Sequence, residues 1–150
     1  SMIRTSRKAL LLALAAVTLA APVVIAQTLP RTPAPAGASV YVISPANGAT
    51  VKGPQVTVLF GLKGMGISPA GMPMGATGHH HLLIDSELPA NLAMPMPAND
   101  QLVHFGKGQT ETTVTLKPGK HTLQLALGDH NHVPFDPLLA SDKITVTVTE

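Results

Sequence analysis

The residues with the clearest capacity for chemistry in this 150-residue chain are its seven histidines. Four of them form two His-x-His pairs, His79 with His81 and His130 with His132. In an extended strand, residues two apart lie on the same face, so both imidazoles of a pair come within reach of one metal ion. Because the chain has no cysteine, a metal site would use imidazole, thioether or carboxylate ligands.

An all-β fold would bring histidines from three parts of the chain to one end of the domain. We expect residues 79–81 to begin one strand and His104 to end the next. The 130/132 pair then lies in the loop after a later strand. In a seven-strand sandwich the loops at these positions gather at one end. His121 falls at the opposite end and serves as an internal control.

The histidines also have an ordinary structural interpretation. His80 shares a strand face with Leu82 and Ile84, so either His80 or the His79/His81 pair points toward the core. A core histidine that is satisfied by a carbonyl is common. A third interpretation is a pH-sensing cluster, because histidine titrates near neutral pH.

Two Met-Pro-Met segments add soft donors, at residues 72–74 and 94–96. Thioethers suit Cu(I), although methionine often only fills gaps beneath loops. The first segment precedes His79 and belongs to the histidine end, whereas the second starts from the other end unless its connector folds back. Imidazole with thioether favours copper, as Cu(II) or Cu(I), over zinc, which remains possible. The predicted metal ligands are His79, His81, His104, His130, His132, His80, Met72 and Met74.

The segments that position these residues are short stretches rich in Val, Ile, Leu and Thr, separated by Gly, Pro, Asn and Asp. They predict an all-β domain, an immunoglobulin-like β-sandwich of about seven strands. Its surest core positions are Leu123, Leu125 and Leu127 on one strand, and Ile144, Val146 and Val148 on the last. The strands are expected at residues 39–43, 55–62, 79–85, 101–105, 111–116, 121–127 and 143–149.

The first 26 residues are typical of a signal peptide: basic residues, an apolar run over 9–21, and Val24-Ile25-Ala26 before a cleavage point. The apolar run is too short for a spanning helix, so a retained anchor is the weaker alternative. Residues 27–38 predict a Pro-rich linker, and 39–150 the domain. We therefore expect a periplasmic or secreted protein with no stable membrane insertion after cleavage.

Charge excludes one class of partner. Three of the ten basic residues belong to the leader, which leaves seven against eight acidic residues and a mature charge near −1. No basic patch is present to bind nucleic acid or an anionic membrane. The expected partners are a metal ion and another envelope protein as its donor or acceptor.

Three sequence blocks carry a family resemblance: GHHHLLID at 78–85, HFGKGQTE at 104–111 and LGDHNHVP at 127–134. They resemble the signature blocks of the exported bacterial domain-of-unknown-function 4399 family, over about residues 39–149. The resemblance implies an exported single domain without an established activity. In that family a histidine often follows Val-Pro, where this chain has Phe135, so one potential ligand is missing.

A second resemblance covers only the first two expected strands. SPANGATV at 44–51, followed by VTV at 56–58, is similar to the opening of CopC-type copper carriers and of bacterial immunoglobulin-like modules. The carriers usually begin with a ligating histidine at the mature terminus. Here that terminus would be Gln27, so their site is not carried over.

Three functions stay open. The first is a non-enzymatic metal carrier that sequesters or transfers copper. The second is a copper- or zinc-dependent enzyme with an open coordination position, in which Glu111 or Asp129 would be a general base. Asp129 is more simply explained as a turn former after Gly128. The third is an envelope interaction module whose histidines are structural.

Overall fold

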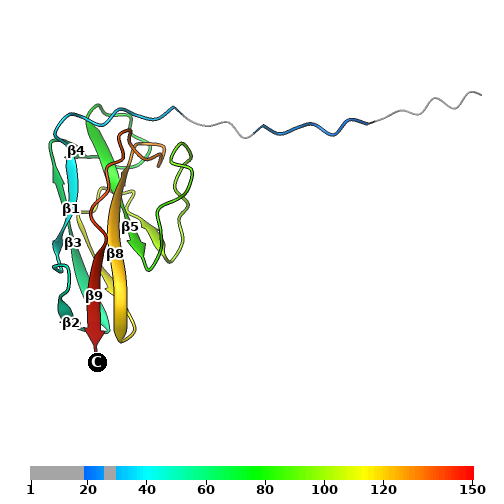
Figure 1. Ribbon diagram of the computed structural model, residues 1–150. Coiled ribbons are helices and arrows are strands. Elements are labelled where there is room, and N and C mark those ends of the chain that lie inside the picture. The colour runs from blue at the N-terminus through cyan, green and yellow to red at the C-terminus, as the bar shows by residue number, and fades with distance from the viewer. Residues whose placement is uncertain (1–18, 26–29) are drawn as a thin grey trace, which may run out of the picture.

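The computed structural model describes residues 19–25 and 30–150, and all regular structure in these ranges is β-strand (Figure 1). The alternation of β-branched and polar residues accounts for the longer strands, which end at Gly, Pro and Asn turns. The strands are β1 (Ser39–Ser44), β2 (Thr50–Lys52), β3 (Gln55–Lys63), β4 (Gly66–Ile67), β5 (Thr77–Ile84), β6 (Leu102–His104), β7 (Glu111–Thr115), β8 (Gly119–Gly128) and β9 (Ile144–Thr149).

Two packed sheets are formed. One has the order β1-β3-β7, and the other has the order β2-β9-β8-β5-β4, with β6 also paired to β5. The pairs are antiparallel except β2 with β9 and β4 with β5. The prediction of an all-β fold with packed sheets is confirmed, whereas its immunoglobulin-like character stays a prediction. β2 and β4 were not predicted, because two or three residues carry no readable alternation.

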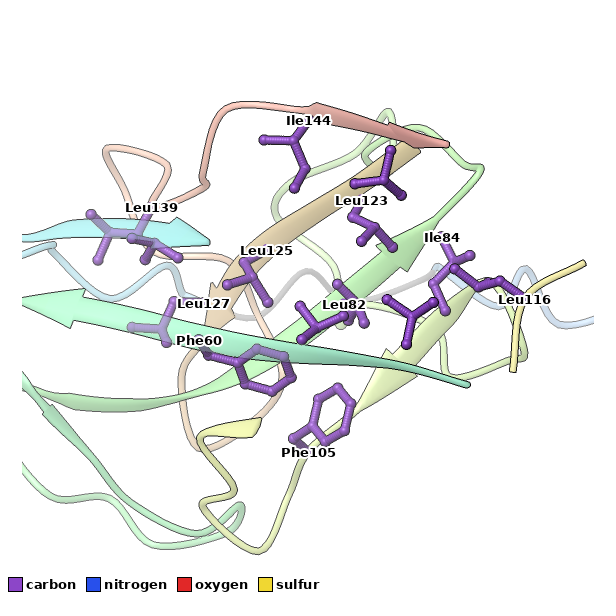
Figure 2. Packing of buried hydrophobic residues seen from close by; sticks show 14 of the residues in the cluster. Phe60, Leu82, Ile84, Phe105, Leu116, Leu123, Leu125, Leu127, Leu139 and Ile144 are labelled. Carbon is purple, nitrogen blue, oxygen red and sulfur yellow. The ribbon is translucent and has the colours of Figure 1, made fainter. Parts of the chain in front are cut away.

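The core lies between the inner faces of the two sheets (Figure 2). Val58 and Phe60 of β3 face Leu82 of β5 and Leu125 of β8 across the interior, and all four are buried. Each such side chain contributes about 1.5–3 kcal/mol of transfer free energy. The six predicted core positions are all buried: Leu123, Leu125, Leu127, Ile144, Val146 and Val148.

The second sheet is also covered on its outer face. The connector between β5 and β6, green in Figure 1, folds back and packs a smaller apolar cluster against Leu83 of β5 and Ala126 of β8. Met96 and Leu102 complete this cluster. From Gly78 to Ile84, every residue of β5 is therefore buried, whichever way its side chain points.

Of the segment predicted as a linker, residues 30–38 are described; they form one isolated bridge and a turn, and part of them is bonded to the domain. Ala34 N donates to Asp136 O at 2.9 Å, and Asp136 N donates to Thr32 O at 2.9 Å. The Arg31 guanidinium donates to the carbonyls of Pro134 and Phe135. Residues 31–34 thus brace the loop that follows β8.

Most of the predicted signal peptide lies outside the described residues, as does the expected cleavage point after Ala26. Residues 19–25 have no regular structure and are exposed. Within the described ranges, none of the elements is a helix that could span a bilayer.

His121 lies at the end of β8 opposite to the other histidines, as expected. Its Nδ1 is 2.7 Å from Asp85 Oδ2, and its Nε2 is 2.7 Å from Lys117 O. The hydrogen bond to Asp85 raises the pKa of His121. Gly128 lies seven residues further along β8, a distance of about 23 Å. His121 is therefore bonded through both nitrogens and remote from the other imidazoles.

The first prediction concerns Gly78 of β5, which packs against Gly128 of β8. A Cβ there would lie 2.6 Å from Gly128 O and 2.8 Å from Phe135 Cε2. Gly78→Ala should therefore destabilise the domain by about 1–3 kcal/mol in urea unfolding. Gly75→Ala is the matched control, because its Cβ would meet nothing within 4 Å. Equal stability of the two variants would contradict this packing.

Candidate metal centre

Four histidines from three parts of the chain converge on the outer face of the second sheet: His79, His81, His104 and His132. Each offers one ring nitrogen, and these nitrogens all lie within 4.8 Å of one another. Ligands about 2.0–2.1 Å from a metal are separated by about 3.3 Å in a tetrahedron and about 4.1 Å across a square plane. The group therefore has the dimensions to hold an ion after a small contraction.

Strand register places three of the four ligands. His79 and His81 lie two apart on β5 and share its outer face. His81 pairs directly with His104 of β6, and their rings stack with centroids 5.1 Å apart. Gly128 of β8 lies opposite His79, and a Cβ on Gly128 would come within 2.8 Å of His81 Cε1. A glycine at this position gives the imidazoles their room.

A turn places the fourth ligand. Asp129 Oδ1 accepts from the backbone N of Asn131 at 2.9 Å and of Val133 at 3.1 Å, and Oδ2 accepts from Thr32 Oγ1 at 2.7 Å. The expected role of Asp129 as a turn former is thus what the structure shows. His132 has φ 64°, a left-handed conformation that histidine adopts more readily than most residues. Such strain is commonly found at functional sites.

The imidazole nitrogens are short of hydrogen-bond partners. His79 Nε2 lies 3.0 Å from His132 Nδ1 and 3.1 Å from His104 Nε2, so three ring nitrogens meet at one place. Neither nitrogen of His81 has a partner among the described residues, although both are buried. An unsatisfied buried polar group costs about 1–3 kcal/mol. Without a ligand, the group is a source of instability.

Burial also keeps the deepest imidazoles neutral. It lowers the pKa of His81 to about 3, and His79, His104 and His132 lower it further. The Ala126 backbone opposes this shift, although it lies outside hydrogen-bond geometry with either nitrogen of His81. Burial, followed by repulsion from His132 and His104, lowers the pKa of His79 to about 4. The pKa of His104 is lowered mainly by burial. His79 and His81 therefore offer lone pairs to a cation over the whole neutral range.

Two predicted histidine ligands lie elsewhere. His80 points to the inner face of β5, where its ring packs 5.1 Å from that of Phe60. It cannot join His79 and His81, because successive side chains of a strand point to opposite faces. His130 is not in the group either, because the chain turns between Asp129 and His132 instead of continuing as the strand that would align the pair.

Both methionine segments lie at the histidine end, the first as expected and the second because its connector folds back. Met72 and Met74 are 47% and 55% exposed and are not in the core clusters. Met96 is buried, its backbone N donates to His132 O at 2.9 Å, and its Cε lies near the same point above Gly128 as His81 Cε1. The second Met-Pro-Met segment marked Met96 as a possible soft donor. Local sequence does not predict the path of a long connector, so its position near His81 could not be inferred.

Phe135 bears on the ligand expected from the family resemblance. Its side chain is buried in the main core, against Gly78 on the inner face of β5. A side chain at position 135 is therefore on the opposite face of the strand from the four-histidine group. The phenylalanine at this position removes no ligand from that group.

Fold and site together define an all-β protein with a histidine group that could hold a metal ion. The sequence matches the family described as Domain of unknown function (DUF4399) over residues 58–149, and the chain belongs to that family. The matched region contains all four histidines of the group. No curated protein matches the chain. A comparison with solved structures likewise finds no match.

The second prediction concerns acid stability without metal. An unfolded histidine has a pKa near 6.5, whereas burial lowers that of His80 to about 4, as for His79. Below pH 6.5 the unfolded chain binds protons that the folded chain does not, so stability is present above 6.5 and lost as pH falls toward 4. The loss from pH 7 to 5 should be about 1–2 kcal/mol for each of His79, His80 and His81.

Urea unfolding with a chelator present, at several pH values, measures this loss. His80→Phe should reduce the pH dependence of the unfolding free energy by the contribution of one histidine. It should leave metal binding intact, because His80 packs only in the core. A flat profile from pH 7 to 5 would contradict the burial of these imidazoles.

The third prediction is that His81 lowers stability in the absence of metal. His81→Leu should raise the free energy of unfolding by about 1–3 kcal/mol with chelator, because it removes two unpaired buried nitrogens. His121→Leu should do the opposite, since both of its nitrogens are hydrogen-bonded. Thermal and urea unfolding of the two variants decide the point, and destabilisation by His81→Leu would count against it.

Proposed function

We propose that this chain is a periplasmic protein that binds a transition-metal ion, copper first, for sequestration or transfer. The ligands are the four-histidine group of His79, His81, His104 and His132. The observation that carries the proposal is the state of His81. Its two nitrogens are buried and unpaired among the described residues, inside a group of imidazoles that converge on one point.

Structural roles alone explain this arrangement poorly. Buried polar groups in folded proteins are hydrogen-bonded in the large majority of cases. Here several ring nitrogens lack partners, and like-charge repulsion lowers the pKa values of His79 and His81 further. A bound cation would use the lone pairs and remove the free-energy cost of the unpaired nitrogens. Without a cation, the buried imidazoles would only destabilise the fold.

The donor set supports copper. Imidazole suits copper, zinc, iron and nickel, and among divalent first-row ions Cu(II) generally binds most tightly. Met96 lies beside the group, bonded through its backbone to His132 and close to His81. A thioether near the ion favours copper, because zinc rarely takes this ligand. Zinc is the second candidate.

The number of ligands supports holding over catalysis. Four protein ligands complete a tetrahedral shell, whereas catalytic sites keep one position open. Glu111, a possible general base, begins β7 in the other sheet, and the Asp129 carboxylate is engaged in the turn. An enzyme would show itself as turnover of superoxide by the copper-loaded chain.

The leader pattern supports the location. Basic residues, an apolar run and a small-residue end precede the domain, and the domain has no cysteine to be oxidised after export. An exported carrier needs a donor or acceptor for its ion, and another envelope protein would fill that role.

The fourth prediction tests this function by titrating tag-free protein with Cu(II), Cu(I) and Zn(II) against competing chelators. His132→Ala and His81→Ala should each weaken Cu(II) binding by more than about 100-fold, since each removes a direct ligand. His130→Ala is the closest control, two residues from His132 on the same turn, and His121→Ala is the remote one. Both controls should change the Cu(II) affinity less than about threefold.

Two results would overturn the proposal. Equal losses from His130→Ala and His132→Ala would show that the ligands are not those of the four-histidine group. Binding no tighter than about 1 μM by the unaltered chain would leave an envelope interaction module as the better account of the domain.

A further inference from the structure

A second set of soft donors lies at the surface beside the four-histidine group. Met72 and Met74 are 47% and 55% exposed, and within residues 30–150 Ile43 is the only other large apolar side chain described as exposed. Methionine usually serves to fill gaps in a core, and these two do not. Their thioethers are instead presented to solvent on both sides of a proline.

Backbone bonds fix this segment against the turn that carries His130. Gly71 N donates to His130 O at 2.9 Å, and Met74 N donates to Met72 O at 2.8 Å. Thr77 Oγ1 donates to Met74 O at 2.8 Å, at the point where β5 begins. The methionine segment is thus held at both ends, by the histidine turn and by β5.

His130 and Met74 line the same open cavity of about 200 Å³, and Met72 lies outside its wall, next to Pro73. Pro73, Thr77 and Asp129 contribute to its walls. The Asp129 carboxylate is already engaged by Thr32 and by two backbone amides, and His130 Nε2 lies 3.1 Å from Asn131 Nδ2. The side-chain donors left at the cavity are the Met74 thioether and His130 Nδ1, which are soft and borderline. One imidazole with thioethers suits a monovalent d10 ion such as Cu(I) or Ag(I) better than a hard or divalent ion.

We propose that Met72, Met74 and His130 form a surface site for soft monovalent ions, separate from the four-histidine group. The two sites are joined by the Asp129 turn, because His130 and His132 lie two residues apart on it and only His132 faces the inner group. The surface site captures the reduced ion where solvent reaches it. Its further role in loading the inner group rests on the function proposed above, but its existence does not.

The test follows the methionine methyl signals of the tag-free chain by NMR during titration with Ag(I), a redox-inert substitute for Cu(I). Single Met→Leu variants assign the signals. Up to one equivalent, Ag(I) should shift the Met72 and Met74 methyls in the unaltered chain and in His81→Leu, which lacks an inner ligand. The double variant Met72→Leu/Met74→Leu should lose this binding by at least tenfold, and Met94→Leu, from the other Met-Pro-Met segment, should retain it.

Three results would overturn the surface site: Met72 and Met74 signals that do not move, signals that move only with excess silver, or shifts that vanish in His81→Leu. The last would make these methionines part of the inner group. A separate titration distinguishes the two proposals. If Ag(I) binds the methionines while Cu(II) and Zn(II) fail to bind the four histidines, the surface site stands and the proposed function of the inner group does not.

Discussion

Alternation of side chains along β5 is the constraint on which the rest of the site depends. Three successive histidines occupy a strand that is covered on both faces, so each must be buried and neighbours must point in opposite directions. His80 enters the core beside Phe60, and His79 and His81 enter the outer layer. The pairing of β6 with β5 adds His104, and the Asp129 turn adds His132. Together with His79 and His81 they form the four-histidine group.

Such a group lowers the stability of the metal-free fold and provides ligands for an ion. The unpaired nitrogens of His81, the crowded imidazoles and the left-handed His132 all weigh against the folded state when no ion is present. An ion that binds only the folded chain returns that stability through linkage. The polar layer is supported by what surrounds it: apolar cover from Met96 and Leu102, and the brace from Thr32 to Asp129.

Much of this could be predicted from the sequence. Turn residues and alternation located seven strands and six core positions. The end-of-strand argument separated His121 and grouped the other six histidines, of which His79, His81, His104 and His132 converge. Two inferences went too far, for one physical reason: spacing fixes a side chain's direction only while the chain stays extended. The turn at Asp129 separates His130 from His132. The 86–100 connector folds back and buries Met96 near His81, whereas Met72 and Met74 remain exposed beside the turn.

The central claim is that these four imidazoles bind one ion. X-ray absorption at the copper edge of the Cu(II)-loaded chain, at one equivalent, reads the ligand shell directly. The account predicts four imidazole nitrogens at about 2.0 Å, with the multiple scattering that imidazole rings produce, and loss of one of them in His132→Ala. A shell dominated by water oxygens, or one unchanged in His132→Ala, would contradict it.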